Sequence, residues 1–510
     1  MTSRRSFLAL LSIISTNGCG SNNKNIPQNN HAALSENPFQ LGVSSGDPCD
    51  DGFVIWSRLC LPDEYNKQDV EIWWSIEEEN NELAQSGKAI AYNSLSHSIH
   101  IEVSNLKNNC WYIYKLKLGQ FEIQGRARTL PGKNFNLNHI RLAYASCQRW
   151  EDGFYSAYQQ MVLDSPDYVV FLGDYIYEYN CRKKGAARQH HLRKALSLQD
   201  YRDRYTLYKS DPNLQKIHAF CTWIITWDDH EVSNNYTEKN GGNYSSTRQI
   251  LSAYQAYYEN MPIRAGSILK WLGIRIKEVK LYRAYHFGSL LSMFVLDNRQ
   301  YRDGVIIFDN NKKQLAVGED RTMLGKDQLS WLRLSIEKSL PENRKWNFIA
   351  QQTRFTPSNY IDGKGRNYNI DTWDAFYNER QKIVDFFKSS HTENLVIIGG
   401  DIHKNWVAEI HEDLYDLKTK TIGVEFCGTS ISSLPERTNN KKIKKWLSDN
   451  PHCLFINEKY RGYGMIDIYP SEIHVRLKAV ENAKNPFSPV ITLAEFKVKN
   501  TQEKMTIQRV

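Results

Sequence analysis

Polar side chains follow seven apolar runs in the second part of the sequence, at the point where each run ends. The runs span residues 140–145, 168–172, 221–226, 290–296, 346–350, 395–398 and 424–426. Asp174 and Asp401 each follow a run and a glycine, and Asp228 follows a third run. A carboxylate fixed at a strand end is a rigid ligand for a hard cation, and several together are costly to bury unless positive charge neutralises them. The pattern therefore predicts a metal site.

Further ligand types lie in the same segments. The candidates are Cys147 after the first run, Tyr177 after the second, Asn235 after the third and His403 after the sixth. Taken alone, an aspartate in such a place is more typical of an Asx turn, and a cysteine or tyrosine is more typical of a buried core position. The recurrence of ligand types after successive runs favours the metal site.

The apolar runs themselves predict the elements that position these side chains. Each run is short and continuous, and helix-like periodic stretches separate them, which indicates strands buried on both faces of an α/β domain. Ligand sites of such sheets lie at the carboxyl ends of the strands. Before this region, short alternating runs between residues 39 and 129 predict a small antiparallel β-sandwich of about 90 residues.

Composition limits the other functions that the chain could have. The 510 residues exceed the usual size of a single core, so we expect two domains. A net charge of +8, from 65 basic and 57 acidic residues, comes with no basic stripe, which argues against specific nucleic-acid recognition. Nine cysteines without a C-x-x-C pair do not predict a disulfide framework, although one or two bridges after export would be compatible.

The N-terminus has the pattern of an export signal. Arg4 and Arg5 precede the apolar stretch 7–14, as in a signal peptide for the twin-arginine route. Cys19 and the polar stretch after it resemble the lipid-modified cysteine and tether of a bacterial lipoprotein, and cleavage to a soluble form fits equally well. We therefore expect residues 1–30 to be a signal and tether, and the protein to be periplasmic, anchored at the cell surface or secreted.

Six blocks of residues carry a resemblance to a known family. They are Gly42 to Pro48, Ala145 to Gln148, Gly173 to Glu178, Trp227 to Glu231 with Asn234-Asn235, Leu296 to Arg302, and Gly400 to His403. Together they resemble the alkaline phosphatase D (PhoD-like) family, in order, from about residue 36 to 475. The resemblance implies an α/β (α+β) metallophosphoesterase sandwich of the calcineurin-like superfamily, preceded by a fibronectin-like or Ig-like β-sandwich. The expected boundaries are 36–131, 138–485 and a C-terminal tail at 486–510.

The resemblance also implies the cofactors, Fe³⁺ and Ca²⁺, and their ligands. The positions that match the family pattern are Cys147, Asp174, Tyr177, Asp228, Asn235 and Asp401, and His403 is added as a ligand or phosphate contact. A thiolate and a phenolate suit a trivalent ion, whereas aspartate and asparagine oxygens suit calcium. Which ligand binds which ion stays open.

The expected reaction is hydrolysis of phosphate esters. Asp174 would bridge the ions, and a metal-bound hydroxide would attack phosphorus. His230 would donate a proton to the leaving group or hold phosphate, and Arg299 or Arg302 would clamp phosphate oxygens. Monoesters and diesters both fit, and we expect a monomer. A non-catalytic surface protein that binds metal or phosphate, and a nuclease, are the alternatives.

Three other segments have weaker signals. Trp373 to Tyr377 with Arg380 resembles a family block on a helix, where the aromatic residues are expected to pack. His190-His191 lies in a basic stretch that predicts a solvated insertion or a lid, and Gly363 to Gly365 predicts a turn. The alternation at residues 496–499 predicts a strand, with a helix over the site as the alternative.

Overall fold

The computed structural model describes residues 34–65, 67–181, 184–237, 246–272, 275–304, 321–339, 344–358, 371–389, 394–435, 440–500 and 505–510. The predicted signal, the tether with Cys19 and the Gly363 turn lie outside the described residues. The chain divides into two compact units. Unit 1 contains residues up to Pro131, Ala195–Ile224 and Thr247–Lys280, and unit 2 contains Gly132–Lys194, Ile225–Ser246 and Leu281–Val510. The domain boundaries expected from the sequence stay a prediction. They divide the chain linearly, whereas unit 1 also includes two later segments.

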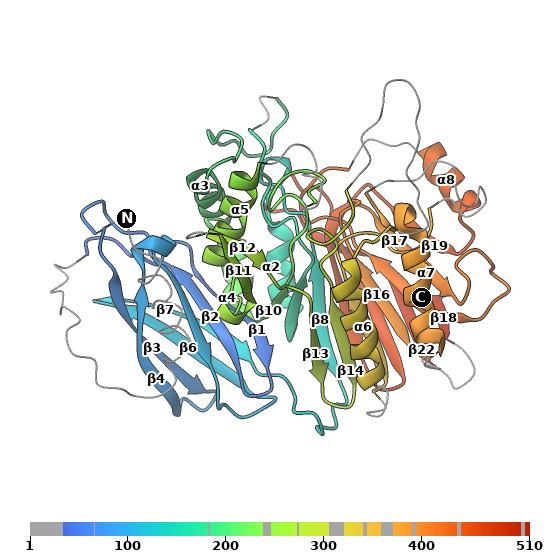
Figure 1. The fold of residues 1–510 in the computed structure, drawn as a ribbon, viewed down its shortest axis with the longest axis horizontal. Helices are drawn as coiled ribbons and strands as arrows, with labels where there is room; N and C mark the ends of the chain where they lie inside the picture. Colours follow the sequence, from blue (N-terminus) through green and yellow to red (C-terminus); the bar gives the residue numbers. More distant parts are fainter. Residues whose placement is uncertain are drawn as a thin grey trace. The chain divides into compact units, whose positions relative to one another are not determined.

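Unit 1 is built on two groups of β-strands (Figure 1). One is an antiparallel sheet in the order β4 (Leu83–Ala91), β3 (Val70–Glu78), β6 (Trp111–Leu118) and β7 (Phe121–Arg128). In the other, β1 (Val43–Cys49), β2 (Gly52–Arg58) and β5 (Ser98–Val103) are antiparallel, and β10 (Thr222–Ile225) pairs with β1 in parallel. Buried residues alternate with half-exposed ones along β6, as expected for a strand with one face on a core.

Most of the remaining elements of unit 1 come from its two later segments. They are the helices α3 (Leu198–Lys209), α4 (Pro212–Phe220) and α5 (Thr247–Asn260), the hairpin β11 (Ile268–Leu272) and β12 (Arg275–Val279), and the short 3-10 helix η4 (Ala265–Ser267). The 3-10 helix η1 (Asn93–Leu95) lies in the first segment. A capping box between Ser197 and Asp200 fixes the start of α3, and Asp211 caps α4.

Unit 2 also contains two groups of strands. The first runs β23 (Met505–Arg509), β22 (Val490–Asn500), β21 (Glu472–Val480), β20 (Arg461–Ile468), β8 (Ile140–Ala145) and β9 (Tyr168–Phe171). The second is a sheet in the order β13 (Arg283–Phe287), β14 (Leu291–Val295), β15 (Trp346–Ala350), β16 (Leu395–Gly399), β18 (Thr421–Cys427), β17 (Asn405–His411) and β19 (Cys453–Asn457). Its helices are α2 (Ser156–Leu163), α6 (Gly325–Ser339), α7 (Tyr377–Ser389) and α8 (Asn440–Asp449), with η2 (Trp150–Asp152) and η6 (Trp373–Phe376).

All seven predicted apolar runs form strands. The ends of β14, β15, β16 and β18 are level with one another, and so are those of β8 and β9. Val295 lies opposite Ala350, Ala350 opposite Ile398, and Ile398 opposite Phe426 in parallel register, while Ala145 lies opposite Phe171. Because these strands end at the same register, the loops that follow them start at one edge of each group. α6 and α7 share one apolar cluster with β14, β15 and β16, which holds these strands on one face.

Two predictions outside the strand runs have clear outcomes. The C-terminal alternation forms β22 and is followed by β23, so the strand is confirmed. The solvated insertion is wrong for His190, which is buried with its Nε2 3.3 Å from Oε1 of the buried Glu151, whereas His191 is exposed. Leu192 N–H donates to His190 Nδ1, so Nε2 carries the proton toward the carboxylate. Among the described residues, no helix is long and apolar enough to cross a bilayer.

Candidate metal centre

Five of the seven predicted metal ligands have left-handed backbone conformation. Their φ angles are 59° at Cys147, 56° at Asp174, 57° at Asn235, 64° at Asp401 and 52° at His403. Such angles are uncommon outside glycine, and they concentrate at functional sites where the surrounding structure fixes them. Gly173 has a φ of +105°, and a Cβ there would collide with the backbone of Asp228. The loops therefore adopt unfavourable backbone conformations at the positions that carry the predicted ligands.

Glu231 holds the loops of Asp174 and Asp228 through hydrogen bonds to their backbone. Its Oε1 accepts the backbone N–H of Tyr175 at 2.6 Å, and its Oε2 accepts those of Asp174 at 3.1 Å and Asp228 at 2.9 Å. Burial raises the pKa of this glutamate to about 7, although the backbone donors oppose the shift. One side chain thus aligns the loops after β9 and β10.

A first group of ligands collects around Asp174. Its Oδ2 accepts the Tyr177 hydroxyl at 2.7 Å, and that hydroxyl also lies 3.1 Å from Nε2 of His403. The sulfur of Cys147, a carboxylate oxygen of Asp174 and a ring nitrogen of His403 all lie within 4.8 Å of one another. His403 Nδ1 lies 2.9 Å from the carbonyl of Leu434. When that nitrogen donates, the Nε2 lone pair faces the group, as in histidine ligands held by an outer partner.

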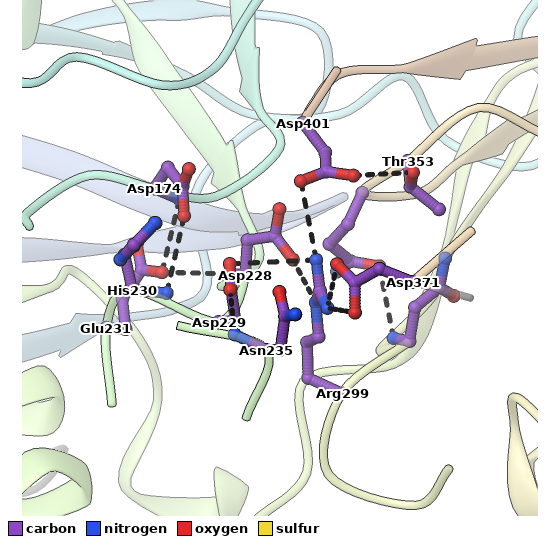
Figure 2. Close-up of polar contacts among 12 residues, drawn as sticks. Asp174, Asp228, Asp229, His230, Glu231, Asn235, Arg299, Thr353, Asp371 and Asp401 are labelled. Atoms are coloured by element: carbon purple, nitrogen blue, oxygen red, sulfur yellow. Dashed lines mark hydrogen bonds and ion pairs between the residues drawn. The ribbon is translucent and has the colours of Figure 1, made fainter. Parts of the chain in front are cut away.

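A second group contains Asp228, Asp229 and Asp401, whose oxygens also lie within 4.8 Å of one another. Figure 2 shows Asn235 beside Asp229, and the backbone N–H of Asn235 donates to that carboxylate. Thr353 donates its hydroxyl to Asp401 at 2.7 Å. Oδ2 of Asp228 is buried and accepts no hydrogen bond. A buried carboxylate oxygen without a hydrogen-bond donor, among other carboxylates, is suited to bind a cation.

His230 joins the two groups. A nitrogen of His230 and oxygens of Asp174 and Asp229 lie within 4.8 Å of one another, so Asp174 and Asp229 are each shared between two groups. His230 Nδ1 lies 2.8 Å from Oε2 of Glu178. Burial lowers the pKa of His230, but Asp229, Asp174 and Glu178 outweigh it and hold the pKa well above its usual value. The three carboxylates around His230 therefore favour its protonated form at this junction.

The predicted clamps Arg299 and Arg302 lie among aspartates. Arg299 is fully buried, donates through Nε to Asp228, and contacts Asp371 through Nη1 at 2.9 Å. Its Nη2 lies 3.5 Å from Asp401 and 3.6 Å from Asp229 (Figure 2). Arg302 Nη2 lies 2.8 Å from Asp371. Both guanidinium groups neutralise carboxylates in this structure, and their role as phosphate clamps stays a prediction.

The carboxylates still outnumber the cations. Burial raises the pKa of Asp174 and Asp228 well above the usual range, and raises the pKa of Asp401 to about 6 in spite of Arg299. Burial and the Asp174 charge also raise the pKa of Cys147 and of Tyr177. A bound cation reverses this situation, because it favours the ionised form of every group that it touches. The donor set therefore fits metal ions.

The structure brings all seven predicted ligands into this one region and adds residues that the sequence analysis did not assign. These are Asp229, Asp371, Glu178, Glu231 and Ser433, whose hydroxyl donates to Tyr177 at 2.9 Å. Asp229, Glu231 and Glu178 lie inside the blocks that resemble the family. Their carboxylates next to predicted ligands could have indicated that they belong to the site. Asp371 follows no apolar run, so no comparable signal marked it.

Comparisons with known proteins agree with this geometry. Residues 142–477 match the model of the PhoD-like phosphatase family, and residues 24–131 match the model of the N-terminal domain of PhoD-like phosphatases. Alkaline phosphatase D of Bacillus subtilis (strain 168) is 37% identical over 485 residues, which cover 91% of this chain and 81% of that protein. A solved structure of PhoD aligns with a TM-score of 0.85 at 36% identity, covering 94% of this chain and 93% of that one.

Proposed function

Since this chain belongs to the PhoD-like phosphatase family and is a phosphoric ester hydrolase, we propose that it works with iron(III) and calcium held at the strand-end loops. The observation that supports the metal assignment is the shared position of Asp174 and Asp229 between three overlapping ligand groups. Groups that share a carboxylate can hold neighbouring ions, as two-metal phosphoesterases require.

The chemistry of the donors suggests how they divide. Cys147 and Tyr177, on the two sides of Asp174, would supply the thiolate and phenolate that suit iron(III). Asp228, Asn235 and Asp401 would supply the neutral and anionic oxygens that suit calcium, and the orphaned Oδ2 of Asp228 is one such oxygen. His403 would bind iron or contact phosphate through Nε2.

Metal ions bound here would supply a water of lowered pKa and stabilise negative charge on the phosphoryl oxygens. The residues of the chain would supply the rest. His230, held by Glu178 at 2.8 Å, would donate its proton to the leaving oxygen of the ester. Arg299 and Arg302 would balance the aspartates and, where a phosphoryl group enters, share hydrogen bonds with its oxygens.

We also propose a superfamily for unit 2, a sandwich type for unit 1 and an export route. Unit 2 would be a calcineurin-like metallophosphoesterase domain, and the N-terminal strands of unit 1 would form a fibronectin-like sandwich. The pair Arg4-Arg5 and the apolar stretch after it support export by the twin-arginine route, with or without a lipid on Cys19. Replacing both arginines by lysine and fractionating cells would test the route, and unchanged export would contradict it.

Asp174→Asn tests the proposed mechanism. We expect the variant to lose at least about 1,000-fold in turnover of a chromogenic phosphate ester, because it lacks the shared carboxylate. Metal analysis of the same preparation should show less iron and less calcium per chain. Asp467→Asn is the matched control, because Asp467 is buried in the same unit but pairs with Arg141 on a neighbouring strand. Full turnover with Asp174→Asn would disprove the mechanism.

A substrate panel separates the remaining choices. Wild-type protein would be assayed on a monoester, a diester, a phospholipid and an oligonucleotide, with metal content measured in parallel. Turnover of small esters with both metals bound supports the proposal. Protein that holds iron and calcium but hydrolyses none of the four would instead support the non-catalytic binder.

A further inference from the structure

The outer face of the four-stranded sheet in unit 1 carries a groove. Its volume is about 510 Å³. The lining residues are Trp73, Trp74, Ser75, Ser86, Lys115, Lys117, Gly119 and Glu122, which come from β3, β4, β6, the turn after β6, and β7. This volume lies within the range of sites that take small ligands or a stretch of a chain. All of the lining belongs to unit 1, and none of it belongs to the metal centre.

Trp73 is the most exposed tryptophan that lines this groove. Its side chain is 55% exposed, whereas its neighbours Ile72 and Ile76 on the same strand are fully buried. In the sheet register Trp73 lies opposite Lys88 on one side and Lys117 on the other. Lys88 Nζ is 4.5 Å from the ring centroid. The indole ring is thus a flat apolar surface framed by polar side chains on both neighbouring strands.

The charges of the groove nearly cancel. Lys115 pairs with Glu77 at 2.8 Å, and Lys88 pairs with Glu71 at 2.7 Å. Lys117 lies opposite Glu122 in the register of β6 and β7. A surface with paired charges does not attract a polyanion, and a single exposed ring is too small a patch for a protein or membrane interface. Hydroxyl, ammonium and carboxylate groups around the ring offer both donors and acceptors.

We propose that this groove binds a neutral glycan chain. One sugar ring would place its apolar C–H face on Trp73, and its hydroxyl groups would exchange hydrogen bonds with Ser75, Ser86 and Lys117. A polyhydroxylated ring needs donors and acceptors around an apolar platform and no net charge, and the groove provides these three features together. The binding site would hold the enzyme on a polysaccharide surface while unit 2 hydrolyses esters.

Calorimetric titration of the purified full chain tests the proposal. The probes are cellohexaose and chitohexaose, with polyphosphate and neutral phosphatidylcholine vesicles as the alternatives. We expect saturable binding of at least one oligosaccharide, and at least about tenfold weaker binding by Trp73→Ala, because a stacked ring is lost. Turnover of a soluble chromogenic ester should be the same in both proteins.

Trp111→Ala is the matched control. Trp111 also lies on β6 of this sheet, but it does not line the groove. Its replacement should change the oligosaccharide affinity by less than about twofold. Absence of binding to both oligosaccharides, equal binding by Trp73→Ala, or Trp73-dependent binding to polyphosphate or vesicles instead would each overturn the proposal.

Discussion

Two clusters of buried charged side chains in unit 2 contain the same residue types but differ in how their charges balance. In the first, Asp374 is fully buried between Arg354, whose Nη2 lies 2.6 Å from Oδ2, and Arg380, whose Nη1 lies 2.9 Å from Oδ1. Ser358 donates its hydroxyl to the same Oδ2 at 2.6 Å. Both carboxylate oxygens thus have cationic partners.

The second cluster is the metal centre, where carboxylates exceed cations. Its acidic members are Asp174, Asp228, Asp229, Asp371, Asp401, Glu178 and Glu231, and its cationic ones are Arg299, Arg302 and His230. Burial raises the pKa of Asp374 too, but Arg354 and Arg380 outweigh it and leave its pKa lowered. In the metal centre Arg299 does the same for Asp229 and Asp371, whereas burial leaves the pKa of Asp174, Asp228 and Asp401 raised. A balanced cluster serves the fold, and an unbalanced one marks where a ligand must complete the charge.

The same substitution in both clusters gives the largest expected contrast. Asp228→Asn should lower turnover of a phosphate ester by at least about 1,000-fold, about 4 kcal/mol, because an oxygen that calcium needs is lost. Asp374→Asn should keep turnover per folded molecule within about threefold, since its partners Arg354, Arg380 and Ser358 do not belong to the ligand groups. The measurement is kcat corrected for the folded fraction. Equal losses in the two variants would remove the distinction between the clusters.

The contrast should reverse when stability is measured. Asp374→Asn leaves two buried guanidinium groups without their carboxylate, and we expect it to lower the free energy of unfolding by about 3 kcal/mol. In protein stripped of metal, Asp228→Asn should change that free energy by less than about 1 kcal/mol, because the repulsion that it removes among neighbouring aspartates offsets the contact that it loses with Arg299. Urea unfolding of both variants, before and after chelation, checks this. A stripped Asp228→Asn protein that is the less stable of the two would contradict it.

The sequence predicted the strands that lead to the site because full burial leaves a clear mark. A strand covered on both faces, such as β15 or β16, must be apolar at every position, and such runs are visible without a structure. β21 was not assigned, because one of its faces is only half-buried and polar or charged residues alternate with apolar ones along it. Alternation of this kind predicts a strand with one buried face, and a search for continuous apolar runs does not detect it.

The site was predictable where ligands follow such strands, and only partly predictable elsewhere. Cys147, Asp174 and Asp401 stand directly after runs, so their convergence follows from the register of the strands. Arg299 contacts Asp228 and Asp401, which lie 71 and 102 residues away in the chain, and spacing could not foresee that pairing. Asp371 depends on the same long-range packing, which explains why it was missed.

The smallest expected effect concerns acid stability and sharpens the contrast further. The lowered folded pKa of Asp374 means that its contribution to stability is fully present above the unfolded value of about 3.9, and is lost as the pH falls through the lower folded value. The Asp374→Asn variant lacks this titrating carboxyl group. The difference in unfolding free energy between wild type and this variant should therefore be constant from pH 7 to about 5, and shrink below about pH 4.

Urea titrations at fixed pH values between 7 and 3 would measure that difference. Asp467→Asn offers a second test of the same sign, because the pKa of Asp467 is also lowered: burial raises it, but Arg141, His139 and Arg476 outweigh the burial. Asp467 lies closer to solvent than Asp374, so the screened charges should give a smaller difference at neutral pH. A difference that grows as the pH falls would mean that Asp374 is protonated in the folded protein, and that its two arginines do not balance it.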